Sequence, residues 1–234
     1  MLEENLKSVL ERIENSAKKT GRKKEDIKLV VVTKNVTVEN IKEVVELGIK
    51  DIGENRVQEA EEKHSLLFTH YHSLFTNIKW HMIGHLQTNK TKKAVQIFDL
   101  IQSVDSIHLA EEIDKQAKKI NKIQDCLIEV KVSEEETKYG CLPEKVKELI
   151  EKILELKNIR LCGLMAMAPF FEKPELTRPY FQKAKKLFDD HYSLLNTYCS
   201  LPYLSMGMSN DFEIAIEEGA NMVRIGTAIF KENV

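Results

Sequence analysis

The sequence predicts an α/β protein with a single domain over residues 1–234, a (β/α)8 TIM barrel preceded by one extra N-terminal helix. Short aliphatic runs alternate with helical stretches along the whole chain, which is typical of a parallel sheet. The alternation repeats eight times, the number at which such a sheet closes into a barrel. An open doubly wound sheet is the rival fold, but in place of its usual glycine-rich first turn this chain has Thr33-Lys34-Asn35.

The chain begins with an amphipathic helix. Apolar residues recur at helical spacing between charged residues over positions 1–20, without the apolar stretch of a signal peptide. A polar connection then leads into Leu29-Val30-Val31-Val32-Thr33, whose aliphatic character fits a strand buried on both faces. Similar runs place the other seven strands at residues 50–53, 78–83, 98–102, 125–132, 160–165, 202–205 and 222–225.

Helical spacing of apolar residues marks the segments between these strands. Asn55 is the expected N-cap of one helix, Pro179 suits the first turn of a long helix over 177–198, and Gly219 closes the helix at 211–218. The histidine-rich stretch 65–77 breaks the rhythm and is expected to be an inserted loop or a helix extension. The remaining helices are expected near residues 38–45, 57–60, 87–96, 107–120 and 146–153, with a short extra turn at 228–230.

Composition narrows the classes of function. The hydrophobic fraction of 42% and the charged fraction of 31% are ordinary for a globular protein, and the net charge of −2 offers no nucleic-acid footprint or polybasic membrane patch. No run approaches the ~18 apolar residues of a membrane span. The four cysteines show no Cys-x-x-Cys spacing, which favours reduced thiols in a cytoplasmic protein. We therefore expect neither nucleic acid nor a membrane as a partner.

Lys34 follows the first strand directly, at the carboxyl end where barrels carry their chemistry. A rigid strand anchors its base, and we expect apolar walls that favour the neutral amine, the form that reacts with an aldehyde. The alternative is a lysine that merely marks the exit of the strand into solvent.

Small polar residues and glycines gather after the last two strands. Many barrels bind phosphate in these two loops. Gly207 allows close backbone approach, Ser205 and Ser209 offer hydroxyls, and Gly226-Thr227 precedes the extra turn. Backbone N–H groups at these positions would face an anion. A phosphate site is the interpretation we favour, and a helix cap is the alternative role for Ser209.

Arg224 and the histidines need separate explanations. Arg224 lies within an apolar strand, and a buried arginine needs a partner. Glu129 on the fifth strand and a ring-nitrogen lone pair of a bound ligand are the two alternatives. The histidine pairs 70/72 and 81/85 do not combine with a cysteine or carboxylate at a recognised zinc spacing, so no metal site is expected.

Six motifs spread over nearly the whole chain form a combination far more specific than any one of them. They are Val31-Val32-Thr33-Lys34, Gly53-Glu54-Asn55-Arg56-Val57-Gln58-Glu59, Trp80-His81-Met82-Ile83-Gly84-His85-Leu86-Gln87-Thr88-Asn89-Lys90, Gly163-Leu164-Met165, Leu204-Ser205-Met206-Gly207-Met208-Ser209-Asn210-Asp211 and Val223-Arg224-Ile225-Gly226-Thr227-Ala228-Ile229-Phe230. This combination resembles the pyridoxal 5′-phosphate homeostasis proteins, the YggS/PROSC or alanine racemase N-terminal-like family.

The resemblance implies a barrel that holds pyridoxal 5′-phosphate (PLP) as a Schiff base on Lys34. Arg224 would face the pyridine nitrogen, and Ser209, Gly226 and Thr227 would cradle the phosphate. The implied cofactor-binding residues, which add Ser205 near the phosphate and four residues lining the ring, are Lys34, Asn55, His81, Met165, Met167, Ser205, Ser209, Arg224, Gly226 and Thr227.

Two positions depart from the family pattern. Arg56 stands where many members have tyrosine, and the chain stops at Val234, where members often carry a glycine and a short tail. The resemblance also implies a carrier or regulator in intracellular PLP homeostasis, without a dedicated turnover reaction. Alanine racemases add a β-domain with a catalytic tyrosine, and nothing follows the last strand here. Racemisation needs a base on each face of the α-carbon, and Lys34 supplies only one.

Two alternative functions stay open. One is a small PLP-dependent racemase or lyase, and the other is a phosphosugar isomerase on the same barrel without the cofactor. For the PLP-binding function, the expected partners are PLP, apo PLP-dependent enzymes and amino acids. We expect a cytoplasmic monomer or weak dimer.

Overall fold

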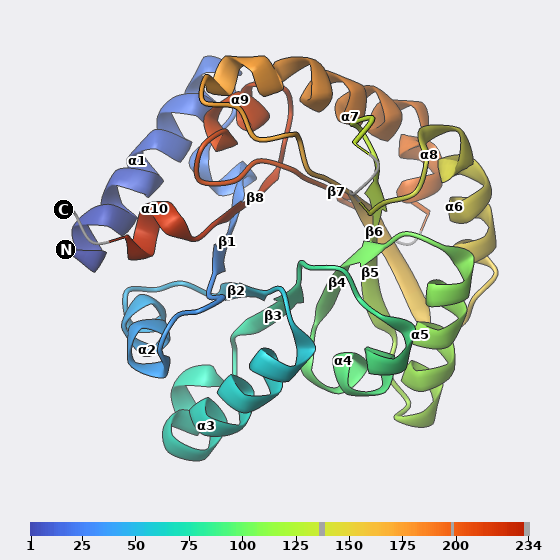
Figure 1. Ribbon diagram of the computed structural model, residues 1–234, viewed down its shortest axis with the longest axis horizontal. Coiled ribbons are helices and arrows are strands. Elements are labelled where there is room, and N and C mark those ends of the chain that lie inside the picture. Colours follow the sequence, from blue (N-terminus) through green and yellow to red (C-terminus); the bar gives the residue numbers. More distant parts are fainter. Residues whose placement is uncertain (136–138, 198, 232–234) are drawn as a thin grey trace.

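Eight parallel strands close into a barrel in the order in which they occur in the chain (Figure 1). The computed structural model describes residues 1–135, 139–197 and 199–231. The (β/α)8 fold and the extra N-terminal helix are thereby confirmed. The strands are β1 (Lys28–Val32), β2 (Asp51–Glu54), β3 (Lys79–Met82), β4 (Leu100–Val104), β5 (Gln124–Val130), β6 (Ile159–Ala166), β7 (Tyr203–Ser205) and β8 (Met222–Ile225).

Helices cover the outside of the barrel (Figure 1). Their apolar faces pack on the outward-facing strand residues, which explains both the helical spacing and the aliphatic character of the strands. The helices are α1 (Leu2–Lys19), α2 (Val38–Glu46), α3 (Val57–Phe75), α4 (Thr91–Ile97), α5 (Ile107–Lys119), α6 (Val146–Leu154), α7 (Arg178–Asp190), α8 (Tyr192–Leu195), α9 (Phe212–Glu217) and α10 (Thr227–Phe230).

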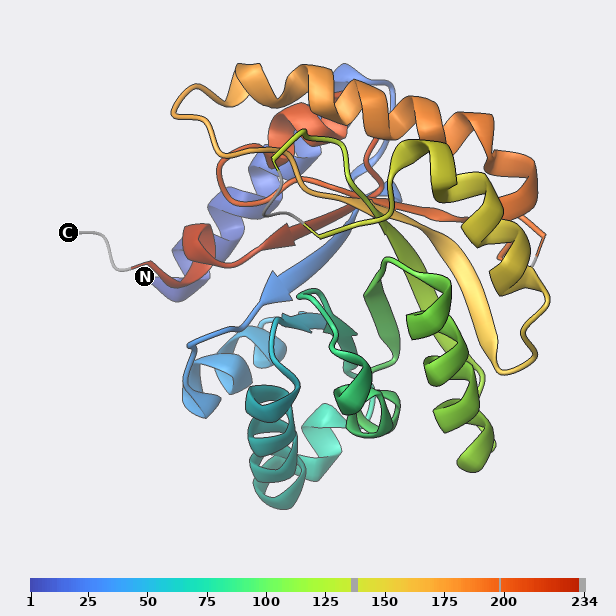
Figure 2. The ribbon, with the colours of Figure 1, turned by 45° about the vertical axis from the view of Figure 1, so that its right-hand side comes forward.

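The N-terminal helix covers the seam where the barrel closes. β1 and β8 lie side by side through four paired residues (Figure 2). In α1, Arg12 Nη2 lies 2.7 Å from Glu213 Oε2 of α9, and Asn5 Nδ2 donates to the carbonyl oxygen of Ile229 in α10 at 3.1 Å. The first helix therefore holds α9 and α10, the last two helices, beside the strands at which the barrel closes.

Three local features differ from or refine the expectations. The stretch 65–77 is a helix extension, because α3 continues to Phe75 with a break in helical geometry at Tyr71 (φ −137°, ψ 34°). The long helix expected over 177–198 divides at His191 into α7 and α8, and Tyr198 lies outside the described residues. The expected Asn55 cap is wrong, since β2 runs on to Glu54 and Arg56 becomes the N-cap residue, without a side-chain cap bond.

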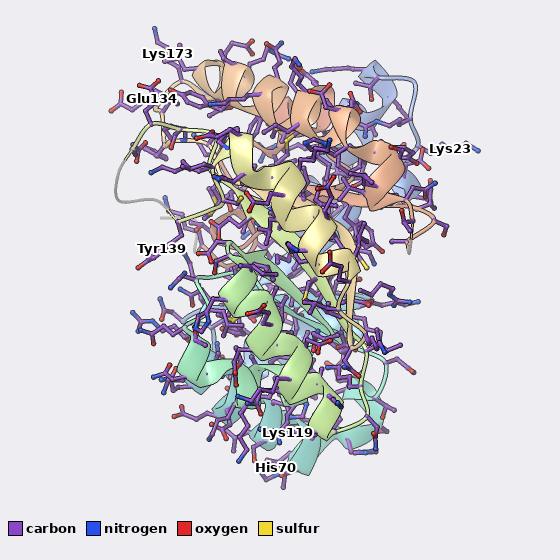
Figure 3. The ribbon with its side chains drawn as sticks, turned by 90° about the vertical axis from the view of Figure 1, so that its right-hand side faces the viewer. Lys23, His70, Lys119, Glu134, Tyr139 and Lys173 are labelled. Carbon is purple, nitrogen blue, oxygen red and sulfur yellow. The ribbon has the colours of Figure 1, made fainter. Side chains whose placement is uncertain are left out.

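The carboxyl ends of the strands face one side of the molecule. Glu134, Tyr139 and Lys173, in loops that follow β5 and β6, lie toward one side of Figure 3, whereas Lys23, which precedes β1, projects from the opposite side. Inside the barrel a small apolar cluster forms the floor beneath those loops. Its members are Val30, Leu100, Leu127, Cys162, Met165 and Met222.

Candidate functional site

Lys34 lies in the turn after β1, two residues beyond the end of the strand. Its side chain is exposed, so the expectation that apolar walls enclose it is wrong. The reason is that β1 ends at Val32, and Thr33 is the last residue of this segment to be buried. The amine is therefore accessible to a ligand at the carboxyl end of the barrel.

A buried cluster of charged residues holds the backbone on both sides of this lysine. Lys63 Nζ of α3 donates to the carbonyl oxygen of Thr33 at 2.6 Å, to Glu54 Oε1 at 2.9 Å and to Glu59 Oε1 at 2.6 Å. Thr33 Oγ1 donates to Glu54 Oε1 at 2.6 Å, and the backbone N–H of Asn35 donates to Glu59 Oε1 at 2.7 Å. We call Thr33, Glu54, Glu59 and Lys63 the rim cluster. Burial raises the pKa of Glu54, and the bonds from Thr33 and Lys63 oppose that shift.

The loops after β7 and β8 meet beside this turn. Val31 pairs with Ile225, so the segment beginning at Gly226 starts next to the end of β1. Ser209 Oγ accepts a hydrogen bond from the backbone N–H of Ala228 at 3.2 Å, which joins the two loops. Among described residues, the backbone N–H groups of Gly226 and Thr227 find no hydrogen-bond acceptor. They remain available to an anion.

Asn55 borders the same area from the end of β2. Its Oδ1 atom is buried, with no hydrogen-bond partner in the described part of the chain. Gly84, after β3, packs against its backbone so closely that a Cβ atom there would lie 2.4 Å from the Asn55 carbonyl oxygen. A side chain at position 84 would therefore displace Asn55. Met165 is fully buried in the barrel floor, and the partly exposed Met167 lies above it.

Arg224 points into the barrel from β8 and is 2% exposed. Its Nη1 donates to Ser205 Oγ at 2.6 Å and its Nη2 donates to the carbonyl oxygen of Ala166 at 3.0 Å. Glu129 forms no hydrogen bond with it in the described structure and acts on it only through charge. Burial raises the pKa of Glu129 to about 7, with Arg224 opposing and Asp105 reinforcing the shift. Glu129, one of the two alternative partners expected for Arg224, is therefore not its hydrogen-bond partner. Within the protein, Arg224 bonds to Ser205 and Ala166 instead.

His81, expected to line the ring, and Ser205, expected near the phosphate, both have hydrogen-bond partners inside the barrel. Both nitrogens of His81 are engaged, Nε2 with Asp51 Oδ1 at 2.9 Å and Nδ1 with Gln102 Nε2 at 3.0 Å. Ser205 Oγ donates to Gln102 Oε1 at 2.7 Å besides accepting from Arg224. These side chains form one connected hydrogen-bond chain through the barrel interior.

Three further observations concern this face and the described chain as a whole. No group of three or more histidine, cysteine, aspartate or glutamate residues within the described ranges could hold a metal ion. A hollow of about 240 Å³ lies between the loops after β6 and β7, next to Ser209. Its lining consists of Met167, Ala168, Pro169, Phe170, Met208, Asn210 and Asp211. In the same described part of the chain, no helix has the length and apolar character needed to cross a membrane.

Comparison with known proteins places this barrel. The family model described as "alanine racemase, N-terminal domain" matches residues 5–234. A pyridoxal phosphate homeostasis protein of Aquifex aeolicus is 48% identical over 229 residues, which cover 98% of this chain and 97% of that protein. The chain belongs to the pyridoxal phosphate homeostasis protein family.

Solved structures agree with this family membership. PipY of Synechococcus elongatus, a structure with PLP bound, superposes with a TM-score of 0.83 at 31% identity, covering 98% of this chain and 100% of that one. An alanine racemase of Clostridium difficile shares the fold, with a TM-score of 0.70 at 19% identity. This chain matches 60% of that longer protein. The homeostasis protein family thus has the barrel of the racemases in a shorter chain.

Three members of these hydrogen-bond networks, Lys63, Asp51 and Gln102, were not predicted from the sequence. Lys63 carries one local signal, because Glu59 and Lys63 are spaced for an i,i+4 ion pair on a helix. Asp51 and Gln102 carry none, since their partners come from other strands and depend on the register and closure of the barrel. The roles that the resemblance gives to the ten cofactor-binding residues stay predictions.

Proposed function

We propose that this protein binds PLP at the carboxyl end of its barrel and takes part in intracellular PLP homeostasis as a carrier or regulator. One observation supports this above all. Three kinds of group that suit PLP come together where β1 and β8 end side by side. They are the accessible amine of Lys34, the N–H groups of Gly226 and Thr227, and the N–H donors of Arg224 that have no acceptor among described residues. PipY, which covers the same length, holds PLP. The whole chain, residues 1–234, would act as one PLP-binding domain.

The residues fit the cofactor group by group. PLP supplies an aldehyde that condenses with a primary amine, and Lys34 offers that amine on a turn fixed by the rim cluster. Ser209, Gly226 and Thr227 would bind the phosphate largely through backbone N–H groups, together with the hydroxyls of Ser209 and Thr227. Each charge-assisted hydrogen bond of this kind contributes ~1.5–3 kcal/mol.

Arg224 would bind the ring through donors that the protein leaves without acceptors. Only two of the five N–H donors of Arg224 have acceptors among described residues, so three remain for a ligand acceptor such as the ring nitrogen. Asn55 offers the unpaired Oδ1 atom, and Met167 offers partly exposed apolar surface that packs on the fully buried Met165. Ser205 and His81 would act through Arg224, since their polar atoms already have protein partners.

Arg224 also explains why dedicated catalysis is not expected. Carbanion chemistry is strongest when a carboxylate keeps the ring nitrogen protonated, and an arginine cannot accept that proton. A protonated nitrogen beside the guanidinium would bring two positive charges together, at a cost on the order of 1–4 kcal/mol. The bound cofactor would therefore exchange with amines but withdraw electrons weakly.

A PLP-dependent racemase or lyase is the second candidate, and one observation favours it. Glu129 has a pKa raised to about 7 at the barrel mouth, where it could transfer protons near neutral pH. Incubation with L-alanine and L-serine followed by chiral analysis separates the candidates. Turnover that disappears in Glu129→Gln would support the enzyme, and the absence of turnover would support the carrier.

Borohydride reduction of the purified protein with PLP tests the proposal directly. The wild type should be yellow, and reduction should fix a phosphopyridoxyl group on the peptide that contains Lys34. Lys34→Ala should lose both the colour and the adduct. Lys50→Ala, which removes an exposed lysine just before β2, is the matched control and should retain both. The same adduct on another residue in Lys34→Ala would refute the assignment.

A further inference from the structure

Among the described residues, five buried polar side chains are linked by hydrogen bonds inside the barrel, where TIM barrels usually place branched aliphatic residues. Buried polar groups are costly unless they are hydrogen-bonded, and each of these five bonds to at least one of the others. We call this series of four hydrogen bonds the core chain. Its bonds join Arg224 Nη1 to Ser205 Oγ (2.6 Å), Ser205 Oγ to Gln102 Oε1 (2.7 Å), Gln102 Nε2 to His81 Nδ1 (3.0 Å) and His81 Nε2 to Asp51 Oδ1 (2.9 Å).

Gln102 is the link that spans the barrel. It lies on β4, and Ser205 lies on β7, strands that are not neighbours in the closed sheet. Their hydrogen bond therefore crosses the interior instead of following the wall. Lys28 Nζ lies 3.2 Å from Asp51 Oδ1 at the far end of the chain. Although burial raises the pKa of Asp51, bonds and charges from His81 and Lys28 lower it overall. The core chain thus begins at a guanidinium and ends at a carboxylate.

Each bond of the core chain has a defined donor and acceptor. Arginine only donates, so Ser205 Oγ accepts from Arg224, and its O–H donates to Gln102 Oε1. The amide then presents its oxygen to Ser205 and its N–H₂ group to His81. His81 Nδ1 then accepts from this group, and Nε2 bears the proton that Asp51 Oδ1 accepts. In this arrangement each of the four bonds has one donor and one acceptor.

We propose that Gln102 is a positioning residue for the PLP site, acting through Ser205 on Arg224. This inference rests on the proposed function. The bond from Arg224 Nη2 to the Ala166 carbonyl alone would let the guanidinium turn about that contact. The second contact, through Ser205, fixes its plane, and Gln102 fixes Ser205. The remaining donors of Arg224 are then held in one direction before the cofactor arrives, which reduces the entropy lost on binding.

PLP affinity in a double-mutant cycle tests this role. Gln102→Met keeps the length of the side chain and removes its bonds to Ser205 and His81. We expect it to weaken PLP binding about tenfold, the effect of one net hydrogen bond. In an Arg224→Gln background the same change should have no further effect, because the group that it orients is gone. The absorbance spectrum of PLP bound to Gln102→Met should shift toward that of Arg224→Gln.

Gln124→Met is the matched control. Gln124 is also a fully buried glutamine, and its Nε2 donates to the carbonyl oxygens of Asp99 and Asp125 at the amino end of β5, outside the core chain. It should alter stability to denaturant but leave the affinity and spectrum of bound PLP unchanged. Ser205→Ala provides a second, independent break in the chain and should match Gln102→Met in affinity and spectrum.

Three outcomes would overturn the inference. If Gln102→Met weakens PLP binding equally in the wild type and in the Arg224→Gln background, Gln102 acts through stability alone. Wild-type affinity and spectrum in Ser205→Ala would contradict the link to Arg224. A wild-type protein that binds no PLP would refute both the proposed function and this inference. If the wild type binds PLP and the variants have the same affinity and spectrum, only the inference is refuted.

Discussion

The rim cluster and the core chain support the two ends of the proposed cofactor site in opposite ways. In the rim cluster, the Lys63 ammonium lies directly between two carboxylates and a carbonyl oxygen, and it holds backbone. In the core chain, neutral groups separate the charges of Arg224 and Asp51, and the bonds hold side chains. The first fixes the base of an exposed Lys34, whose amine has no hydrogen bond to another described residue. The second leaves Arg224 almost no freedom.

This difference matches what each end must do. An amine that forms and breaks a bond with an aldehyde has to move, so only the turn beneath it is fixed. A guanidinium that recognises one ring atom gains from a single orientation, so the side chain itself is fixed. Breaking each network separately should therefore change different properties of the protein.

The largest expected effect comes from breaking the rim cluster with Lys63→Met. This change leaves Glu54, which is 0% exposed, without its cationic partner, and removal of one member of a buried pair costs ~3–5 kcal/mol. Denaturant unfolding at neutral pH measures the loss. The control is Lys42→Met, which removes an i,i+4 pair with Glu46 on the surface of α2 and should change stability little. Equal losses in the two variants would mean that the rim cluster is no stronger than a surface pair.

The next effect concerns Glu129, the carboxyl group that lies near Arg224 without a bond to it. Burial raises its pKa from 4.5 to about 7 in the folded protein. A raised carboxyl pKa contributes stability that is fully present below about pH 4.5 and is lost as the pH rises through about 7. Glu129→Gln cannot titrate, so its stability relative to the wild type should increase by up to roughly 3 kcal/mol between pH 4 and pH 8.

Unfolding free energies of both proteins across this pH range measure the change. Glu111→Gln, at an exposed position on α5, is the control and should follow the wild type. A constant difference between Glu129→Gln and the wild type from acid to neutral pH would show that Arg224 already compensates the Glu129 carboxylate.

The smallest expected effect belongs to the loops after β7 and β8, where we propose that the phosphate binds. Thr227→Val removes one exposed hydroxyl at the start of α10 and should weaken PLP binding about tenfold, the worth of one hydrogen bond. Thr37→Val is the control, because Thr37 caps α2 by accepting from the backbone N–H of Asn40. It should lower stability without changing affinity. Equal affinity of the wild type for pyridoxal and for its phosphate would contradict a phosphate site altogether.

The sequence specified the fold more fully than the site. The eight aliphatic runs and the helical spacing between them depend on local pattern, and the expected strand at 222–225 coincides with β8. Lys34 and Arg224 could be proposed from the sequence because strand ends and buried charges are visible in it, and their roles toward PLP stay predictions. The exposure of Lys34 was missed, since the end of β1 depends on how Thr33 bonds to Glu54. Gln102 was missed because its partner Ser205 is 103 positions away and across the barrel.

The proposed role of Arg224 is to keep the ring nitrogen of bound PLP unprotonated, and ¹⁵N NMR of ring-labelled PLP bound to the wild-type protein measures the protonation state of that nitrogen. The chemical shift distinguishes a protonated pyridine nitrogen from an unprotonated one. We predict an unprotonated nitrogen at neutral pH, with its shift displaced by a hydrogen bond from Arg224 and altered in Arg224→Gln. A protonated ring nitrogen at neutral pH in the wild type would contradict this role of Arg224.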